Sequence, residues 1–526
     1  MDGFFAWVET SAFYVLLRQA NLAIWDLWLG SGIGRVFNQS LKELWRASVA
    51  GHLVRTLVSW AGRSAFVTVL VAVTPRPSSV ALWLRRLIGE ERDTFPVTAL
   101  EKILLYFVVF FVPVELWLIT RLPSSVKYLG DLGLALLFLG TLIRLQQAGW
   151  PLRRSPADLP VALLLAAALL STIWNAVPLH IAIFGIRAYL EYFALYFVVL
   201  YLPLDAGQRR RLLLWLLLFG VAIALFGDAQ KFLHVATPRQ WLAAAEAAAT
   251  RVFGTMGNPN TFGAFLAWLL ALLVALLVLP TRGGLRLLAL IGCVIAGPAL
   301  VFTLSREALV AMAAALLFIG IVADRRLLLL LIVGVLALPV LDPHIVSRFA
   351  LAVSGSYIRL SSSYGRLLFW ERGMQAFLAQ PLLGWGPGRF GGSVAHLYGS
   401  PVYRLFRLDE NPIIDSQHVQ TLVELGLIGY IAYLWLGFAA VRAGLRLFRG
   451  DRDPFWRAMG LGLAAGTVGF YIQSLFASLL ETHQVVLFFW LVFGLVAYRL
   501  RVTVPGRAKT GEDTAAVLHD QRDLAG

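Results

Sequence analysis

The sequence predicts an all-helical membrane protein, a polytopic transmembrane bundle of about 12 spans. Of the 526 residues, 59% are hydrophobic and only 14% are charged, whereas a soluble globular chain carries about 25% charged residues. The mean hydropathy is +0.75. Apolar runs recur from Leu100 to Leu500, and many have the roughly 17–25 residues that a helix needs to cross the hydrocarbon of a bilayer.

The apolar runs favour helices over strands. Runs such as 161–173 and 327–341 do not alternate between apolar and polar residues, so they lack the pattern of a membrane barrel. Helices are then the remaining way to satisfy every backbone polar group inside a bilayer. The single cysteine, Cys293, excludes a disulfide framework within the chain. The start at Met1 lacks the basic region of a cleavable signal peptide.

The basic residues indicate the topology. We expect spans at 100–120, 127–145, 158–175, 179–202, 211–232, 261–280, 285–304, 306–323, 326–342, 418–441, 457–480 and 483–500. Arginines gather in the connections that follow every second span, which places both ends of the chain in the cytoplasm. The net charge of +15 is therefore interpreted as a topology signal, and we expect no nucleic-acid partner. The connections with this excess hold Arg153 and Arg154; Arg209, Arg210 and Arg211; Arg282 and Arg286; Arg325 and Arg326; Arg442, Arg446, Arg449, Arg452 and Arg457; and Arg499, Arg501, Arg507 and Lys509.

The chain divides into three parts by composition. Residues 96–502 form the predicted transmembrane domain, with a long extracytoplasmic loop at 343–417 between the ninth and tenth spans. Residues 1–95 mix apolar residues with frequent charges and tryptophans, which is typical of helices at the inner membrane interface. This N-terminal extension is interpreted either as a platform on membrane lipids or as a specific binding module. Residues 503–526 are polar and predict a disordered cytoplasmic tail.

Two ionisable residues lie inside the fourth predicted span. Arg187 is followed one helical turn later by Glu191. An arginine within the membrane is costly and usually faces the interior of a bundle. The two residues are interpreted either as a buried ion pair at positions i and i+4 or as part of an anion site near the outer leaflet.

Two predicted helices begin at the outer face beside arginines. Asn258 and Pro259 are typical of a helix start, with Arg251 upstream and Asn260 just after them. Ser305 precedes Arg306 at the start of the eighth span and is a suitable cap. Capping alone explains the asparagine and the serine. The nearby arginines also fit a site for phosphate oxygens, because helix N-termini attract anions.

The long outer loop holds further candidates. An amphipathic helix is predicted to begin near Arg366 and to end near Pro381. His418 lies at the start of the tenth span, where a histidine titrates near neutrality and can act as a general base. A structural role for His418 is the alternative. Asp415, three residues earlier, is placed to orient it.

We expect no metal and no cofactor. No His/Cys cluster has the spacing of metal ligands. The Asp451-Arg452-Asp453 motif falls on the predicted cytoplasmic side, and no phosphate-binding loop or nucleophile elbow occurs in a suitable context.

Taken together, these motifs resemble the O-antigen ligase and polymerase family of bacterial membrane glycosyltransferases. The resemblance covers roughly residues 100–500, and one departure is that Val419 follows His418 where the family usually has a His-Asn pair. The matching pieces are Arg251 with Gly254 and Asn258-Pro259-Asn260; Ser305-Arg306; Arg366 with Trp370 and Pro381-Leu382-Leu383-Gly384-Trp385-Gly386; and His418 followed by Glu424-Leu425-Gly426-Leu427-Ile428-Gly429.

The resemblance implies glycan transfer in the bacterial cytoplasmic membrane without a metal. The donor would be a glycan on undecaprenyl diphosphate, and the acceptor a hydroxyl of a glycan, lipid or protein. His418 would be the base of an inverting reaction, with Arg187, Arg251, Arg306 and Arg366 holding the diphosphate. Ligase and polymerase remain two alternatives. A transporter or flippase for polyprenyl-linked glycans is the other function to consider, and a scaffold without catalysis would leave the outer arginines unexplained.

Overall fold

The computed structural model describes residues 96–503, apart from 123, 150–151, 239–249, 342–345, 347–348, 351–353 and 409–411. The chain divides into two units, Met1–Arg92 and Asp93–Gly526, and the described residues all belong to the second. The predicted interfacial extension and nearly all of the predicted disordered tail therefore lie outside the described residues.

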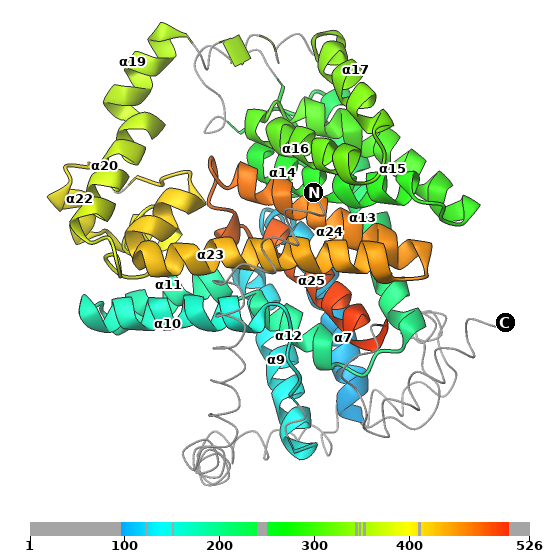
Figure 1. Ribbon diagram of the computed structural model, residues 1–526. Helices are drawn as coiled ribbons and strands as arrows, with labels where there is room; N and C mark the ends of the chain where they lie inside the picture. Colours follow the sequence, from blue (N-terminus) through cyan, green and yellow to red (C-terminus); the bar gives the residue numbers. More distant parts are fainter. Residues whose placement is uncertain are drawn as a thin grey trace. The chain divides into compact units, whose positions relative to one another are not determined.

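The described part of the chain is helical throughout, with 78% helix and no strand, which confirms the predicted fold class. Figure 1 shows the helices in their order along the chain. The longer helices are α7 (Pro96–Phe111), α9 (Leu129–Gln147), α10 (Asp158–Trp174), α11 (Leu179–Leu190), α12 (Phe193–Tyr201), α13 (Ala206–Phe232), α14 (Pro259–Val278), α15 (Gly283–Phe302), α16 (Arg306–Val322), α17 (Arg326–Leu341), α19 (Gly355–Tyr364), α20 (Arg366–Ala379), α23 (Gln417–Gly450), α24 (Pro454–Gln473) and α25 (His483–Thr503). Short helices are α8 (Glu115–Ile119), α21 (Ser393–Tyr398) and α22 (Pro401–Leu405), with 3-10 turns at Val112–Val114, Ser124–Tyr128 and Leu479–Glu481.

The protein is a multi-pass membrane protein, but the count of about 12 spans is not confirmed. Among the described residues, seven helices are long and apolar enough to cross a membrane, or eight if the bent pair α11 and α12 forms one span. The twelve predicted segments all coincide with helices. Length explains part of the difference, because α10, α16 and α17 have 17, 17 and 16 residues. Helix α24 has 20 residues and is long enough, but it is not apolar enough to be counted. The fourth predicted span is bent by 55° between α11 and α12.

Side-chain caps fix the starts of several helices. Asn258 accepts a hydrogen bond from the backbone N–H of Asn260 at 2.8 Å, and Pro259 takes the first position of α14. Asp205 and Gln208 form a capping box at the start of α13. These local bonds explain why the helix starts could be predicted closely from the sequence.

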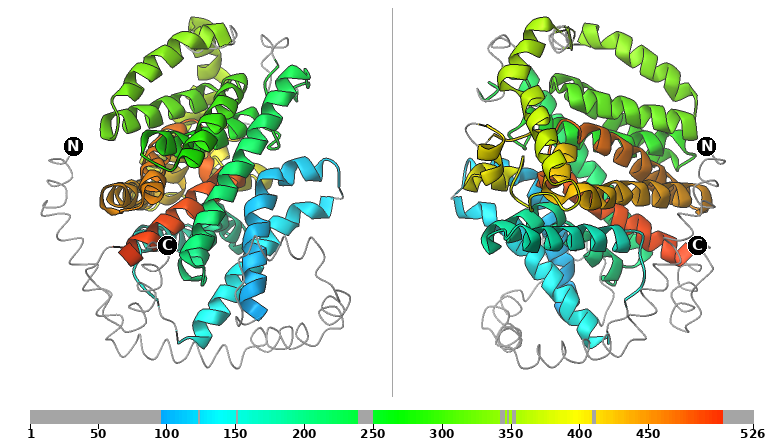
Figure 2. Two further views of the ribbon diagram at one scale, coloured as in Figure 1. Left: turned by 90° about the vertical axis from the view of Figure 1, so that its right-hand side faces the viewer. Right: turned by 60° about the vertical axis from the view of Figure 1, so that its left-hand side comes forward.

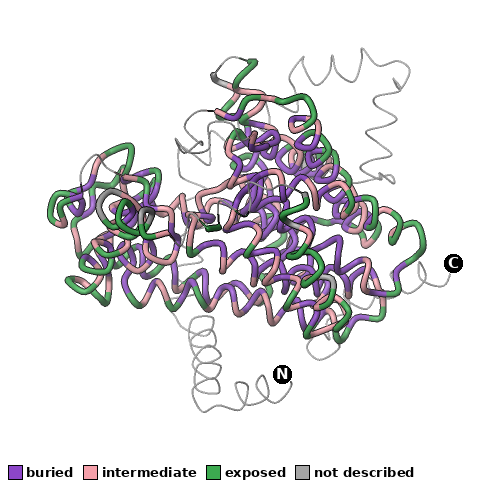
Figure 3. The backbone as a smooth tube through the Cα atoms, turned by 90° about the horizontal axis from the view of Figure 1, so that it is seen from above, coloured by how far each residue is buried: buried purple, intermediate pink, exposed green. Residues whose placement is uncertain are grey.

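Small residues allow the central helices to approach closely. A Cβ at Gly460 of α24 would lie 2.6 Å from the carbonyl oxygen of Gly444 on α23. Such contacts between backbones stabilise helix pairs in membranes, where the surrounding lipid is as apolar as the side chains. Helix α24 packs against α14, α16, α23 and α25, and α25 (red) lies beside it in Figures 1 and 2. Buried residues gather in the interior of this bundle (Figure 3).

The long loop after α17 docks onto a break in α23. Gly426 interrupts this helix with a φ of 63°, a left-handed conformation that favours glycine. The break frees backbone groups, which pair with loop residues: Trp385 N–H donates to the Val423 carbonyl at 2.8 Å, and Leu427 N–H donates to the Pro381 carbonyl at 2.8 Å. Helices α20 and α22 accordingly lie near the first half of α23 (Figure 1).

Candidate functional site

Arg251 lies at the junction of the helices α14 and α16. Its side chain is 4% exposed. The Nε group donates to the carbonyl oxygen of Thr303 at 3.0 Å, and an Nη group donates to Oδ1 of Asn260 at 2.7 Å. The connection before α16 is thereby tied to the first turn of α14. The structure thus brings the end of α15, which is distant in the sequence, against Arg251 and Asn260.

Ser305 and Arg306 begin α16 in the same region. A Cβ at Gly263 of α14 would lie 3.2 Å from the Ser305 Cβ atom, so the first turns of α14 and α16 are in contact. Ser305 occupies the N-cap position, as predicted, but its side chain makes no capping bond, and its Oγ atom has no hydrogen-bond partner in the part of the chain that the structure describes. The backbone N–H of Ser305 instead donates to Oγ1 of Thr303 at 3.1 Å. The prediction that Ser305 caps through its side chain is therefore wrong.

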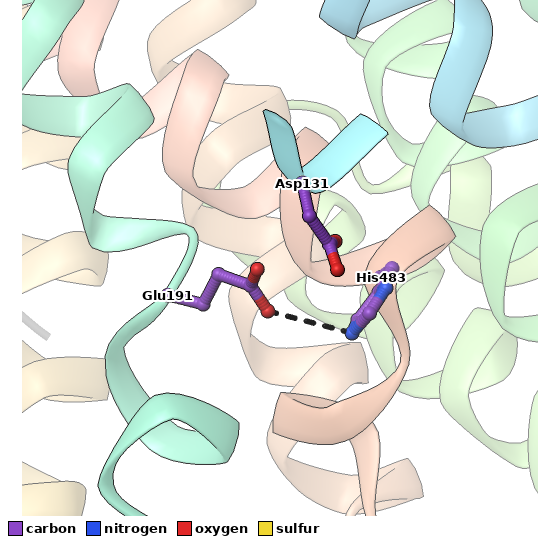
Figure 4. A group of neighbouring side chains, drawn as sticks. All are labelled: Asp131, Glu191 and His483. Carbon is purple, nitrogen blue, oxygen red and sulfur yellow. Dashed lines mark ion pairs between the residues drawn. The ribbon is translucent and has the colours of Figure 1, made fainter. Parts of the chain in front are cut away.

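Arg187 belongs to a second group, made of charged residues from three helices. Its guanidinium is 2.5 Å from Oδ2 of Asp131 on α9 and 2.9 Å from Oε1 of Glu191. Glu191 lies at the bend between α11 and α12, and its other oxygen is 3.6 Å from Nε2 of His483 at the start of α25. The ion pair between Arg187 and Glu191 that the sequence allowed is present. Figure 4 shows Asp131, Glu191 and His483 converging from their separate elements.

The sequence did not indicate this convergence, because the three residues are far apart in the chain. One ligand atom each from Asp131, Glu191 and His483 lies within 4.8 Å of the others, a spacing suited to a metal ion. The Arg187 guanidinium already bonds both carboxylates. One cationic side chain of the protein therefore lies between both acids, and the four residues form a positioned ion-pair network.

His418 lies in the first turn of α23, as expected. Its Nδ1 atom is 3.0 Å from the Tyr430 hydroxyl, and its Nε2 atom is 2.9 Å from the backbone carbonyl oxygen of Tyr471 on α24. The ring also packs edge-on against the ring of Tyr433. A carbonyl oxygen only accepts hydrogen bonds, so Nε2 carries a proton and the neutral ring keeps its lone pair on Nδ1.

Asp415 does not orient His418, contrary to the prediction. Its carboxylate is 2.9 Å from an Nη atom of Arg366, the first residue of α20. The Arg366 side chain is 27% exposed and the Asp415 side chain is 47% exposed. The tenth predicted span therefore begins with two separate arrangements, a half-exposed ion pair at Asp415 and a more buried histidine at His418.

Glu424 is a buried acidic residue of α23 that appeared in the sequence only as part of a motif. It is 0% exposed. One carboxyl oxygen accepts from the Tyr189 hydroxyl at 2.8 Å, and the other accepts from the backbone N–H of Phe390 at 2.9 Å. Glu424 thus joins α11, the outer loop and α23. The sequence contained one signal for this role, because Glu424 is an acidic residue within an otherwise apolar span.

The segment between α17 and α23 also holds an arginine that the sequence did not single out. Arg389 follows the segment docked on α23, and no hydrogen bond or ion pair to its side chain occurs among the described residues. Burial lowers the pKa of this guanidinium from its ordinary value. Its position one residue before Phe390, which Glu424 holds, was not evident from the sequence.

The predicted residues therefore fall into four arrangements. One group lies at the N-terminal ends of α14 and α16 and comprises Arg251, Asn258, Asn260, Ser305 and Arg306. Arg187 and Glu191 form the network with Asp131 and His483, Arg366 pairs with Asp415, and His418 contacts tyrosines on α23 and α24.

Comparison with known proteins identifies part of the chain. No curated protein matches it significantly. Residues 291–434, from α15 to the middle of α23, match the model of the O-antigen ligase family. This stretch contains Ser305, Arg306, Arg366, Asp415 and His418. The resemblance seen in the sequence is confirmed over these residues, and the chain is a multi-pass membrane protein that carries a domain of the O-antigen ligase family.

Proposed function

We propose that the protein transfers a glycan from an undecaprenyl-diphosphate carrier to an acceptor hydroxyl at the outer face of the bacterial cytoplasmic membrane. The family match supports glycan transfer in general. The observation that carries the specific proposal is the buried Arg251 at the joined N-termini of α14 and α16. The proposal also has both ends of the chain in the cytoplasm, as the pattern of arginines predicts.

The junction of α14 and α16 suits a diphosphate. The N-terminus of a helix carries a partial positive charge and unpaired N–H groups. Two such ends meet here, with Arg251 fixed between them and Arg306 at the first position of α16. As the glycosidic bond breaks, negative charge grows on the diphosphate, and fixed donors stabilise it most where water is excluded.

His418 is proposed as the general base. The lone pair on Nδ1 takes the proton of the acceptor hydroxyl, the acceptor oxygen bonds to the anomeric carbon, and the bond from that carbon to the diphosphate breaks with inversion. The Tyr430 hydroxyl occupies Nδ1 in this structure. The acceptor hydroxyl therefore reaches the base by replacing the tyrosine hydroxyl.

The other arginines have supporting roles in this proposal. Arg187 is held by two carboxylates, those of Asp131 and Glu191, so it contributes a guanidinium whose position is fixed. Arg366 is held by Asp415 at the start of α23. Release from Asp415 would allow Arg366 to bind a phosphate oxygen of the donor.

Reconstitution tests the proposal directly. The purified protein would be placed in liposomes with an undecaprenyl-diphosphate oligosaccharide and candidate acceptors that carry sugar hydroxyls. We expect covalent transfer of the glycan and release of undecaprenyl diphosphate. A ladder of growing products indicates a polymerase, and a single transfer to a different acceptor indicates a ligase. Binding of the donor without transfer to any acceptor would contradict the proposal.

A transporter of the same lipid-linked glycans is the second candidate. The bend of 55° between α11 and α12 favours it, because transporters often use broken helices near their substrates. The break in α23 gives less support, since backbone groups of 381–386 fill it. A transporter would move a fluorescent polyprenyl-linked glycan across the bilayer of liposomes without forming a new glycosidic bond.

A further inference from the structure

Among the described residues, three buried polar groups near the start of α16 have no hydrogen-bond partner. They are Oγ of Ser305, Oε1 of Glu307 and Nε2 of Gln473. The residues are 0%, 7% and 1% exposed, respectively. Most buried polar atoms in folded proteins are hydrogen-bonded, so three such exceptions in one region call for an explanation.

The packing of α16 on α24 places two of these groups together. A Cβ at Gly469 of α24 would lie 2.8 Å from the carbonyl oxygen of Ala311 on α16. Glu307 precedes Ala311 by one helical turn, and Gln473 follows Gly469 by one turn, so each lies on the same face of its helix as the contact.

Helix α24 runs antiparallel to α14. Gly462 and Gly466 of α24 pack on Leu272 and Trp268 of α14, so residue numbers rise along α24 as they fall along α14. The starts of α14 and α16 touch where Gly263 meets Ser305. Gln473 at the end of α24 therefore lies at the same end of the bundle as Ser305 and Glu307.

The chemistry of the three groups is complementary to a hydroxyl. Glu307 offers a hydrogen-bond acceptor, the amide nitrogen of Gln473 offers a donor, and the Ser305 hydroxyl can do either. A ligand hydroxyl donates one hydrogen bond and accepts others. A phosphate alone does not match the set, because the Glu307 carboxylate repels it.

We propose that Ser305, Glu307 and Gln473 form a subsite for the hydroxyl groups of the donor sugar that is attached to the diphosphate. The proposal rests on the function proposed above and deepens it. The connection is close, since Thr303 accepts a hydrogen bond from Arg251 through its carbonyl oxygen and one from Ser305 through Oγ1. The sugar subsite therefore adjoins the group assigned to the diphosphate.

Binding measurements with two probes separate the subsite from the diphosphate site. The probes are undecaprenyl diphosphate and undecaprenyl diphosphate that carries a single N-acetylglucosamine, each titrated against the full chain in nanodiscs. The wild type should bind the sugar-bearing probe at least tenfold more tightly than the bare carrier. Glu307→Gln and Gln473→Leu should each remove most of this difference while the affinity for the bare carrier stays within about twofold. Glu371→Gln, an exposed carboxylate on α20, is the matched control and should keep the difference.

The outcomes distinguish the two proposals. If the wild type binds neither probe, the proposed function fails, and the subsite fails with it. If it binds both equally, or if Glu307→Gln keeps the full preference for the sugar, the diphosphate site stands and the sugar subsite is wrong.

Thermal unfolding of the unliganded protein gives a measurement independent of binding. Groups kept unpaired for a ligand make Glu307→Met neutral or stabilising, so its melting temperature should equal or exceed that of the wild type. A structural water that satisfies these groups would have the opposite effect. A clear fall in melting temperature for Glu307→Met, with no loss of sugar preference in Gln473→Leu, would overturn the proposal.

Discussion

The Nε group of Arg251 donates a hydrogen bond to the carbonyl oxygen of Thr303 at 3.0 Å, across a separation of 52 residues. This contact fixes the arginine at the point where α14 and α16 begin. The same arginine holds Asn260 through an Nη atom, so its position depends on both helices.

Arg251→Ala should lower the rate of glycan transfer by about 10²–10³-fold, because it removes a fixed donor from the charge that develops on the diphosphate. Arg251→Lys should restore only part of the rate, since an ammonium group cannot reproduce both bonds of the guanidinium. The measurement is initial transfer rate in liposomes. Arg404→Ala, at an exposed position on α22, is the control. Normal transfer by a well-folded Arg251→Ala protein would remove Arg251 from the site.

His418→Ala should reduce turnover at least about 10²-fold and change donor affinity much less. Tyr430→Phe should keep most of the turnover, because it leaves the Nδ1 lone pair open to the acceptor. Turnover and donor binding would be measured separately on each variant. Equal inactivation by Tyr430→Phe and His418→Ala would contradict the proposed displacement of the tyrosine hydroxyl, and collapse of donor binding in His418→Ala would make His418 a ligand.

Arg366→Ala and Asp415→Ala should change donor affinity in opposite directions. Loss of the arginine removes a cation that can bind phosphate, whereas loss of the aspartate releases that cation from its ion pair of 2.9 Å. The effect on stability should stay below about 1 kcal/mol for either change, because the pair is partly exposed. Titration of undecaprenyl diphosphate against both variants checks this. Weaker binding by both variants would assign the pair a structural role only.

Glycan transfer should persist after treatment with EDTA. Arg187 already bonds Asp131 and Glu191, so the carboxylates have a permanent cationic partner. Transfer rates before and after chelation, and after addition of Mg²⁺ or Mn²⁺, are the measurement. Loss in EDTA with recovery on adding a divalent ion would turn the Asp131, Glu191 and His483 group into a metal site.

Glu424→Ala should destabilise the protein by about 2–5 kcal/mol, because it leaves the Tyr189 hydroxyl and the Phe390 N–H without their shared acceptor. Unfolding of the protein in detergent, induced by heat or by denaturant, measures this effect. Glu371→Ala on the exposed face of α20 should change stability by less than about 0.5 kcal/mol. If the two variants unfold alike, the outer loop does not depend on Glu424.

The local structure could largely be predicted. The starts of α14 and α16 were predicted at Asn258 with Pro259 and at Ser305, and the observed helices begin there, although the Ser305 side chain makes no capping bond. The other helices begin within a few residues of the predicted spans. Apolar length and helix start signals act over one or two turns, so the sequence contains them directly. The number of spans could not be settled in this way, because apolar runs alone do not decide whether helices of 16 or 17 residues, or the bent pair α11 and α12, cross the bilayer.

The partners of the site residues could not be predicted. The sequence placed Asp415 beside His418, yet Asp415 turns to Arg366 on α20, and His418 bonds Tyr430 and Tyr471. Likewise, spacing gave no sign that Asp131 and His483 would join Arg187 and Glu191. Most of these contacts join residues from separate elements, and only the packing of those elements sets the distance. The contact between His418 and Tyr430 lies within α23 but crosses its break at Gly426.

The sequence by itself determined a helical membrane protein with arginines near the starts of α14 and α16, because hydropathy and helix capping are local properties. The tertiary structure alone decided that Arg251 meets Thr303 and that Glu307 and Gln473 lie unpaired at one end of the bundle. The physical reason is that both contacts depend on close packing between helices at glycines such as Gly263 and Gly469. This packing brings together residues that are far apart in the sequence.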